Sequence, residues 1–209
     1  RLTLAPDGSI ASLVETADGR QVFSGPANVI TAYEDKPMTY DAWDIDIFYD
    51  RKSWPVDEVT DCRLIECGPV RAVIRVTKRF LESTVTQDVV MWRDIDRVDF
   101  VSDIDWRERQ VLLKAAFPTD INADSATYEI QYGNVTRPTH KNTSWDWARF
   151  EVVGHKWADL SEEGLGVSLI NDCKYGHDIH DGCLRLTLLK SAVSPSHEAD
   201  RERHQFTYA

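Results

Sequence analysis

The chain has 209 residues and a formal net charge of −11, from 35 acidic against 24 basic side chains. An acidic surface repels phosphate groups and anionic lipid heads, so nucleic acid and membrane partners are not expected. A neutral partner that is rich in hydroxyl groups, such as a sugar, is not repelled in this way.

The first part of the chain predicts hairpins. Residues 2–5 form a short predicted strand, Asp7-Gly8 is a turn sequence, and residues 10–14 form the return strand. Asp18-Gly19 predicts a second turn, and two such turns so close together indicate antiparallel structure. Residues 33–58 lack clear periodicity and are rich in aromatic and charged side chains, so we interpret them as a long, ordered and functional excursion.

Residues 62–118 are predicted to form the main sheet. Val70, Ala72, Ile74 and Val76 alternate with polar residues, which is the period of two of a half-buried strand. The predicted strands of this region are 62–67, 70–80, 84–92, 98–106 and 110–117. Long antiparallel strands at this spacing predict a large twisted sandwich.

The last part of the chain continues the same pattern. Turns are predicted at Gly133-Asn134 and Asp181-Gly182, and residues 191–203 are predicted to be a loop or a short helix. The predicted strands are 126–132, 150–157, 165–170, 184–189 and 204–208. The fold class that follows is all-β, a large antiparallel twisted β-sandwich, and residues 1–209 are predicted to form a single domain. Because the chain lacks an initial Met and stops inside a predicted strand, we expect it to be a fragment of a longer protein.

Two clusters combine tryptophans with carboxylates, namely Tyr40-Asp41-Ala42-Trp43-Asp44 and Trp145-Asp146-Trp147. An indole stacks on the C–H face of a sugar, and a carboxylate accepts hydrogen bonds from its hydroxyl groups. Trp145 and Trp147 would share one face if the segment were extended. The alternative is that these tryptophans fill the space between sheets. Asp44 and Asp146 could also be paired as glycosidase carboxylates, but 35 acidic residues make such a pairing uninformative.

A third segment, Asn171-Asp172-Cys173-Lys174-Tyr175-Gly176, follows an apolar strand and gathers several kinds of polar side chain. Convergent polar groups at the end of a buried strand suit hydroxyl recognition, whereas a plain β-turn is the alternative. Nothing in the sequence indicates that Cys173 is a nucleophile. His177 and His180 are interpreted as exposed hairpin histidines, and the spacing of Cys62, Cys67, Cys173 and Cys183 predicts no zinc site.

The sequence closely resembles the C-terminal region of family 38 α-mannosidases, most of all the cytosolic, cobalt-responsive type. The resemblance spans nearly the whole chain and is carried by the opening hairpin and by five segments, which are residues 40–44, 137–152, 169–176, 186–191 and 204–208. Within them, Trp145-Asp146-Trp147 and Asn171-Asp172-Cys173-Lys174-Tyr175-Gly176 are the most specific motifs.

The resemblance implies a galactose-mutarotase-like β-sandwich that belongs to a retaining exo-α-mannosidase of the cytoplasm. In that family an N-terminal catalytic domain carries the nucleophile and a divalent metal of the zinc or cobalt type. Neither motif is present here, so no catalytic residue, metal ligand or cofactor is assigned to this chain, which is expected to be inactive alone. Its expected partners are that catalytic domain and the mannoside substrate, and the resemblance leaves homo-oligomer formation open.

The expected role of the chain is that of a scaffold and of part of the sugar-pocket wall. The residues expected near substrate are Asp41, Trp43, Asp44, Trp145, Asp146, Asn171, Asp172, Lys174 and Tyr175. One alternative is an independent carbohydrate-binding module without a catalytic role. Another is a mutarotase-like epimerase, which would need a histidine and a carboxylate that converge on one face.

Overall fold

The computed structural model describes all 209 residues of the chain. They fall into two compact units, which are described separately below. Unit 1 consists of Arg1–Ala5, Ser9–Thr31 and Leu113–Leu188, and unit 2 consists of Pro6–Gly8, Ala32–Leu112 and Leu189–Ala209.

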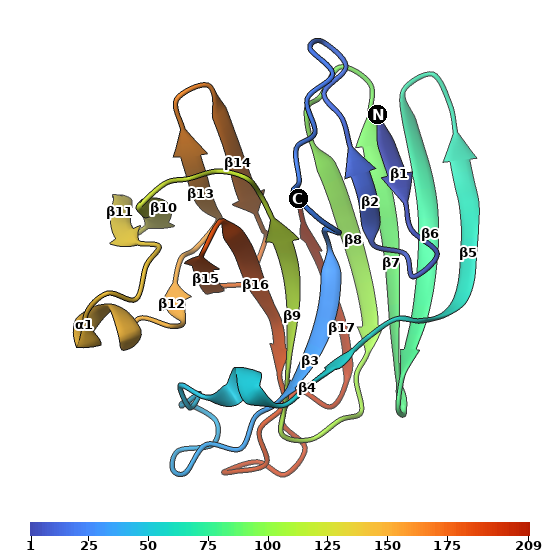
Figure 1. Ribbon diagram of the computed structural model, residues 1–209. Helices are drawn as coiled ribbons and strands as arrows, with labels where there is room; N and C mark the ends of the chain where they lie inside the picture. The colour runs from blue at the N-terminus through green and yellow to red at the C-terminus, as the bar shows by residue number, and fades with distance from the viewer. The chain divides into compact units, whose positions relative to one another are not determined.

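The structure is built from antiparallel sheets, with helix confined to two short turns (Figure 1). A two-stranded sheet pairs β1 (Leu2–Leu4) with β2 (Ile10–Leu13). A six-stranded sheet has the order β12 (Val152–Val153), β15 (Gly176–His180), β16 (Cys183–Lys190), β9 (Val111–Pro118), β3 (Val29–Glu34) and β4 (Ser53–Pro55). The helical elements are η1, a 3₁₀ turn at Tyr49–Arg51, and α1 (Ser144–Trp147).

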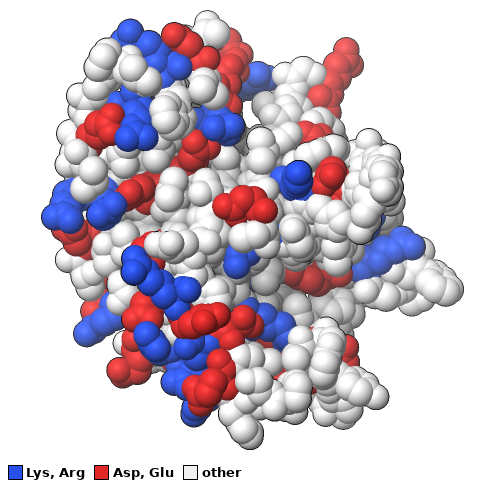
Figure 2. Space-filling view, turned by 180° about the vertical axis from the view of Figure 1, so that it is seen from behind, with Lys and Arg blue, Asp and Glu red and all other residues white.

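Unit 2 contains a five-stranded sheet with the order β17 (Arg203–Tyr208), β8 (Val98–Asp105), β7 (Ser83–Trp92), β6 (Arg71–Phe80) and β5 (Glu58–Cys67). Arg75 of β6 lies opposite Asp88 of β7, and the guanidinium donates to both carboxylate oxygens at 2.7 Å. Such a cross-strand pair fixes the register of two neighbouring strands. Charges of both signs are interspersed over the face of the molecule in Figure 2, so the net negative charge is not gathered in one patch there.

A buried polar group attaches the last strand to this sheet. The Gln87 amide donates to the Tyr208 hydroxyl at 2.7 Å and to Ser102 Oγ at 2.9 Å. Because all three side chains are buried, their hydrogen-bonding groups need partners inside the protein. The interactions of Gln87 therefore connect β7 with β8 and β17 below the surface of the sheet.

Unit 1 contains a four-stranded sheet with the order β11 (Gly133–Pro138), β10 (Ser125–Ile130), β13 (Trp157–Glu162) and β14 (Leu165–Ile170). The turn predicted at Gly133-Asn134 lies about two residues earlier in the chain. Both of these residues belong to β11 and pair with β10, and Tyr132, which lies in the turn, has a φ of 62°. The predicted Asp181-Gly182 turn is confirmed, since φ is 51° and 73° at these two residues. A Cβ atom on Gly182 would lie 2.8 Å from the Thr119 carbonyl oxygen, so both space and backbone conformation require glycine there.

Most of the predicted strands are present, including all five of residues 62–118. The predicted strand 150–157 is largely wrong, because only Val152–Val153 and Trp157 pair. β3 and β15 were not predicted. The long segment between β3 and η1 is an irregular excursion, as predicted. None of the helices is long and apolar enough to cross a membrane.

Candidate functional site

The connection between β14 and β15 is held in one conformation by Asn171. This residue is 6% exposed, its Nδ2 donates to the His155 carbonyl at 2.8 Å, and its Oδ1 accepts from the Lys174 backbone N–H at 2.7 Å. An asparagine that hydrogen-bonds a backbone group ahead of it closes a tight turn. Asp172 and Tyr175 are exposed on this turn and Lys174 is half-buried, so an acceptor, a donor and a phenol are presented together.

His155 extends this cluster and was not predicted as a site residue. Its ring lies 5.2 Å from the Tyr175 ring, between centroids, and its backbone N–H donates to the Glu129 carbonyl at 2.9 Å. In the sequence His155 is a lone histidine inside a region predicted as a strand, so no spacing connects it to residues 171–175. We refer to Asn171, Asp172, Lys174, Tyr175 and His155 as the 171–175 cluster.

Cys173 lies in the same turn, but its surroundings do not favour a nucleophile. Desolvation of the thiol and the neighbouring Asp172 carboxylate raise the pKa of Cys173 above its ordinary value. A raised pKa leaves less of the thiolate that would react. All four cysteines are free, so none of them forms a disulfide.

Trp145 and Trp147 lie on the short helix α1 and not on an extended segment. The Thr143 side chain accepts from the Asp146 backbone N–H at 3.2 Å, and Asp146 Oδ2 accepts from the Thr143 backbone N–H at 3.0 Å, which is a reciprocal helix cap. This hydrogen bonding with Thr143 lowers the pKa of Asp146. Trp145 is 77% exposed, so it does not fill the interior of this chain.

The other residues expected near substrate, Asp41, Trp43 and Asp44, lie on the irregular segment between β3 and η1 in unit 2. Asp41 Oδ2 accepts from the backbone N–H groups of Val193 and Ser194 at 2.7 and 3.2 Å, which attaches the excursion to the loop before β17. Trp43 is 71% exposed and Asp44 is also exposed. The structure therefore gathers Asp41, Trp43 and Asp44 within unit 2, and the 171–175 cluster within unit 1.

A buried group of charges in unit 1 was missed from the sequence. Lys114 of β9 is 1% exposed, and its Nζ donates to Glu151 and, at 2.5 Å, to Asp178. Asp178 also accepts from Arg185 Nε at 2.7 Å, and Thr187 donates to Glu151. Burial alone would raise the pKa of Asp178, but Lys114 and Arg185 outweigh it and hold this pKa below the ordinary value. We call Lys114, Glu151, Asp178 and Arg185 the buried charge cluster.

The prediction that His177 and His180 are exposed is wrong. His177 is 0% exposed and His180 is 8% exposed, because both faces of β15 are covered. Neither ring nitrogen of His177 has a hydrogen-bond partner. A histidine that is closed off in this way cannot reach a sugar, so it does not supply the exposed acid–base pair that an epimerase would need.

The chain offers no metal site. No group of three or more His, Cys, Asp or Glu side chains is placed so that it could hold an ion. The resemblance places the metal in an N-terminal catalytic domain, so no reaction step is assigned to a metal on this chain.

Comparison with known proteins identifies relatives over the full chain. The model of the "Glycosyl hydrolases family 38 C-terminal domain" matches residues 1–198. The chain is 43% identical to Alpha-mannosidase G of Dictyostelium discoideum and 40% identical to human Alpha-mannosidase 2C1, in each case over 100% of this chain and 20% of the relative. It is 36% identical to an Alpha-mannosidase of Saccharomyces cerevisiae over 94% of this chain. The chain thus spans about a fifth of the length of these relatives.

Solved structures share the fold. An alpha-mannosidase from Enterococcus faecalis V583 superimposes with a TM-score of 0.83 at 15% identity, covering 99% of this chain and 27% of that chain. A family 38 protein from Enterococcus faecalis gives a TM-score of 0.80 at 14% identity, covering 99% and 28%. These superpositions and the antiparallel sheets confirm the expected all-β fold class. The chain belongs to glycosyl hydrolase family 38, whose C-terminal domain it represents.

Proposed function

We propose that this chain is the β domain of a retaining exo-α-mannosidase that removes terminal α-mannosides in the cytoplasm. In this proposal the domain serves as a scaffold and supplies part of the sugar-pocket wall to an N-terminal catalytic domain, which holds a divalent metal. Curated relatives that are called alpha-mannosidases, at 36–43% identity, support the reaction class.

The observation that carries the pocket-wall role is the conformation of the 171–175 cluster. Asn171 is buried and uses both ends of its amide to hold the turn, so the cost of ordering this loop is met on folding and not on binding. Asp172 can accept hydrogen bonds from sugar hydroxyl groups, and Lys174 can donate to their oxygen atoms. Tyr175, 50% exposed, offers a ring face beside them.

The proposal predicts that Asp172→Ala reduces catalysis while the fold survives. A hydrogen bond to a charged group contributes about 1.5–3 kcal/mol, so kcat/KM for 4-nitrophenyl α-D-mannopyranoside should fall by about one to two orders of magnitude. The measurement is steady-state kinetics on the full-length protein, with hydrogen exchange of the β14–β15 peptides as a check of the fold.

Asp120→Ala is the matched control, because Asp120 is an exposed aspartate of the same unit outside the cluster. The control should keep the kinetics of the parent protein. Unchanged kinetics in Asp172→Ala would remove this residue from the site. An absence of mannoside hydrolysis by the full-length protein would overturn the reaction class itself.

A further inference from the structure

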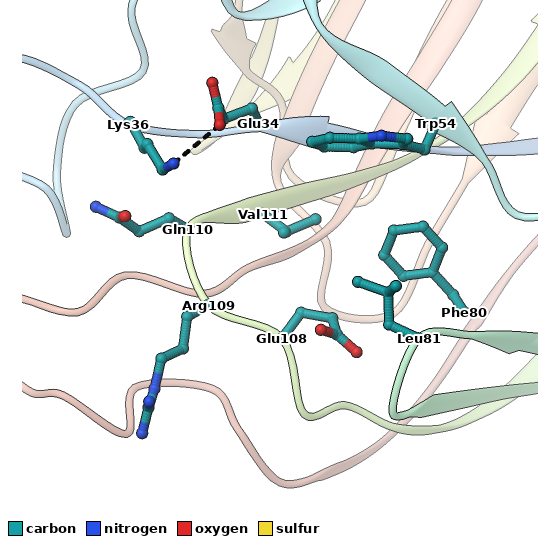
Figure 3. A pocket seen from close by; sticks show the side chains of 9 residues that line it. All are labelled: Glu34, Lys36, Trp54, Phe80, Leu81, Glu108, Arg109, Gln110 and Val111. Carbon is teal, nitrogen blue, oxygen red and sulfur yellow. Dashed lines mark hydrogen bonds and ion pairs between the residues drawn. The ribbon is translucent and has the colours of Figure 1, made fainter.

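Unit 2 contains a pocket that the proposed catalytic role does not use. Its volume is about 250 Å³, and it is lined by Glu34, Lys36, Trp54, Phe80, Leu81, Glu108, Arg109, Gln110 and Val111 (Figure 3). Pockets for drug-sized ligands span roughly 300–1,000 Å³. The smaller volume here suits a single small ring.

One wall of the pocket is aromatic. Trp54 of β4 is 38% exposed, and Figure 3 shows its indole edge-on, with one face turned towards Val111 and, beyond it, Phe80 and Leu81. The pocket is therefore a slot between a flat ring and an apolar surface. This shape matches the flat C–H face of a sugar ring, which stacks on indole.

Leu81 is in an unusual conformation for its residue type. It forms part of the β6–β7 turn with a φ of 50°, and its side chain is 68% exposed. A glycine or asparagine would adopt this backbone conformation at a lower energetic cost, and would expose less apolar surface. Backbone strain of this kind gathers at binding sites, and here it places an aliphatic side chain at the pocket opposite Trp54.

The polar lining contains one carboxylate, that of Glu108, with unused hydrogen-bonding capacity. Glu108 is 9% exposed, and its Oε1 accepts from Ser83 Oγ at 2.7 Å and from the Glu82 N–H at 3.1 Å, whereas Oε2 accepts from no protein group. The Gln110 backbone has a φ of 53° and is fixed by two hydrogen bonds. The Gln110 N–H donates to the Ser191 carbonyl at 2.6 Å, and the Gln110 carbonyl accepts from the Asp35 N–H at 2.8 Å. Figure 3 shows the Gln110 side-chain amide on the side of Lys36, directed away from Trp54. Glu108 Oε2 is not closed off from solvent, so a ligand hydroxyl group would take the place of water there.

The cations that line the pocket already have carboxylate partners. Glu34 pairs with Lys36 and Lys52 at 2.9 and 2.8 Å, and these two lysines lower the pKa of Glu34. Arg109 pairs with Glu198 at 2.5 Å, and Figure 3 shows its guanidinium directed away from the slot. Both cations of the lining, Lys36 and Arg109, are therefore already paired with carboxylates, so a phosphate is not favoured. The ligand that fits is neutral and rich in hydroxyl groups.

We propose that this pocket binds one neutral pyranose ring, stacked on Trp54 with a hydroxyl group on Glu108 Oε2. The proposal does not depend on the catalytic role, because none of the residues expected near substrate lines this pocket.

The test is photoaffinity labelling of the full-length protein with methyl α-D-mannopyranoside that carries a diazirine on its aglycone. Mass spectrometry then locates the label on peptides. We expect saturable labelling of the peptides that contain Trp54 or Leu81, and competition by unmodified methyl α-D-mannopyranoside. Trp54→Ala and Glu108→Gln should each weaken this labelling by about tenfold or more. Tyr132→Ala, which removes a fully exposed aromatic ring elsewhere, should leave it unchanged.

Several results would overturn the proposal. They are the absence of saturable labelling at these peptides, equal labelling in Trp54→Ala and Tyr132→Ala, and competition by inorganic phosphate but not by the neutral sugar. If another segment of the full-length protein protected the pocket peptides from hydrogen exchange and no labelling occurred, a sugar in this pocket would likewise be excluded. Because the label is located by peptide, loss of mannoside hydrolysis alone would leave this inference standing.

Discussion

Replacing Lys114 with methionine is expected to destabilise unit 1 by about 3–5 kcal/mol, the usual cost of breaking a buried ion pair. Lys114 is 1% exposed and donates to Glu151 and Asp178, which would keep their charges and lose their common partner. Arg185 and Thr187 would remain, but neither replaces an ammonium group between the two carboxylates. The measurement is the urea dependence of hydrogen exchange in peptides of β9 and β15 in the full-length protein.

Arg203→Met is the matched control. Arg203 also pairs with an aspartate, Asp103, but its side chain is 66% exposed, and exposed pairs contribute about 0–1 kcal/mol. If Lys114→Met cost no more than Arg203→Met, the buried charge cluster would not stabilise unit 1 in the way described.

Acidification from pH 6.5 towards 4 is expected to destabilise unit 1 through His177. Burial, with a further contribution from Lys114, lowers the pKa of His177 to about 4. In the unfolded chain the His177 imidazole binds its proton at about pH 6.5, whereas in the folded chain it does so only near pH 4. The unfolded state therefore holds more protons across this range. The stabilisation is complete above pH 6.5 and is lost as the pH falls, by about 3 kcal/mol in total.

His177→Phe should flatten this pH dependence, because the ring remains and the ionisation is removed. The measurement is the urea midpoint of hydrogen exchange in β15 and β16 peptides between pH 7 and 4.5, corrected for intrinsic exchange rates. His197→Phe, at an exposed histidine, is the control and should leave the slope as it is. An identical slope in the parent protein and in His177→Phe would show that His177 does not carry the effect.

The long strands could be predicted because their sequences carry two agreeing signals. In residues 70–80 apolar side chains alternate with polar ones, and turn residues bound the segment. β15 lacks the first signal, because both of its faces are buried and alternation disappears. The exposure of His177 and His180 was mispredicted for this reason.

The helix at Trp145 could have been found from the sequence. Thr143 and Asp146 have the spacing of a reciprocal helix cap, and this local preference overrides an extended reading of Trp145-Asp146-Trp147. Lys114 also left a signal, since it lies inside the apolar segment Leu112 to Phe117, and a lysine is almost never buried without a partner.

The candidate site was predicted in part. The residues of the 171–175 cluster are adjacent in sequence, so their grouping followed from the motif, whereas the hydrogen bond from Asn171 to His155 joins positions 16 apart. The charge partners of Lys114 lie 37 and 64 residues away, and only the sheet topology brings them together.

A structure of the full-length protein with a bound, unhydrolysed mannoside tests the central claim most directly. The account predicts Asp172 or Lys174 within about 2.6–3.2 Å of a sugar hydroxyl group, with the turn held by Asn171 as described here. A mannoside bound with Asp172, Lys174 and Tyr175 all out of contact with it would contradict the claim that this domain supplies part of the pocket wall.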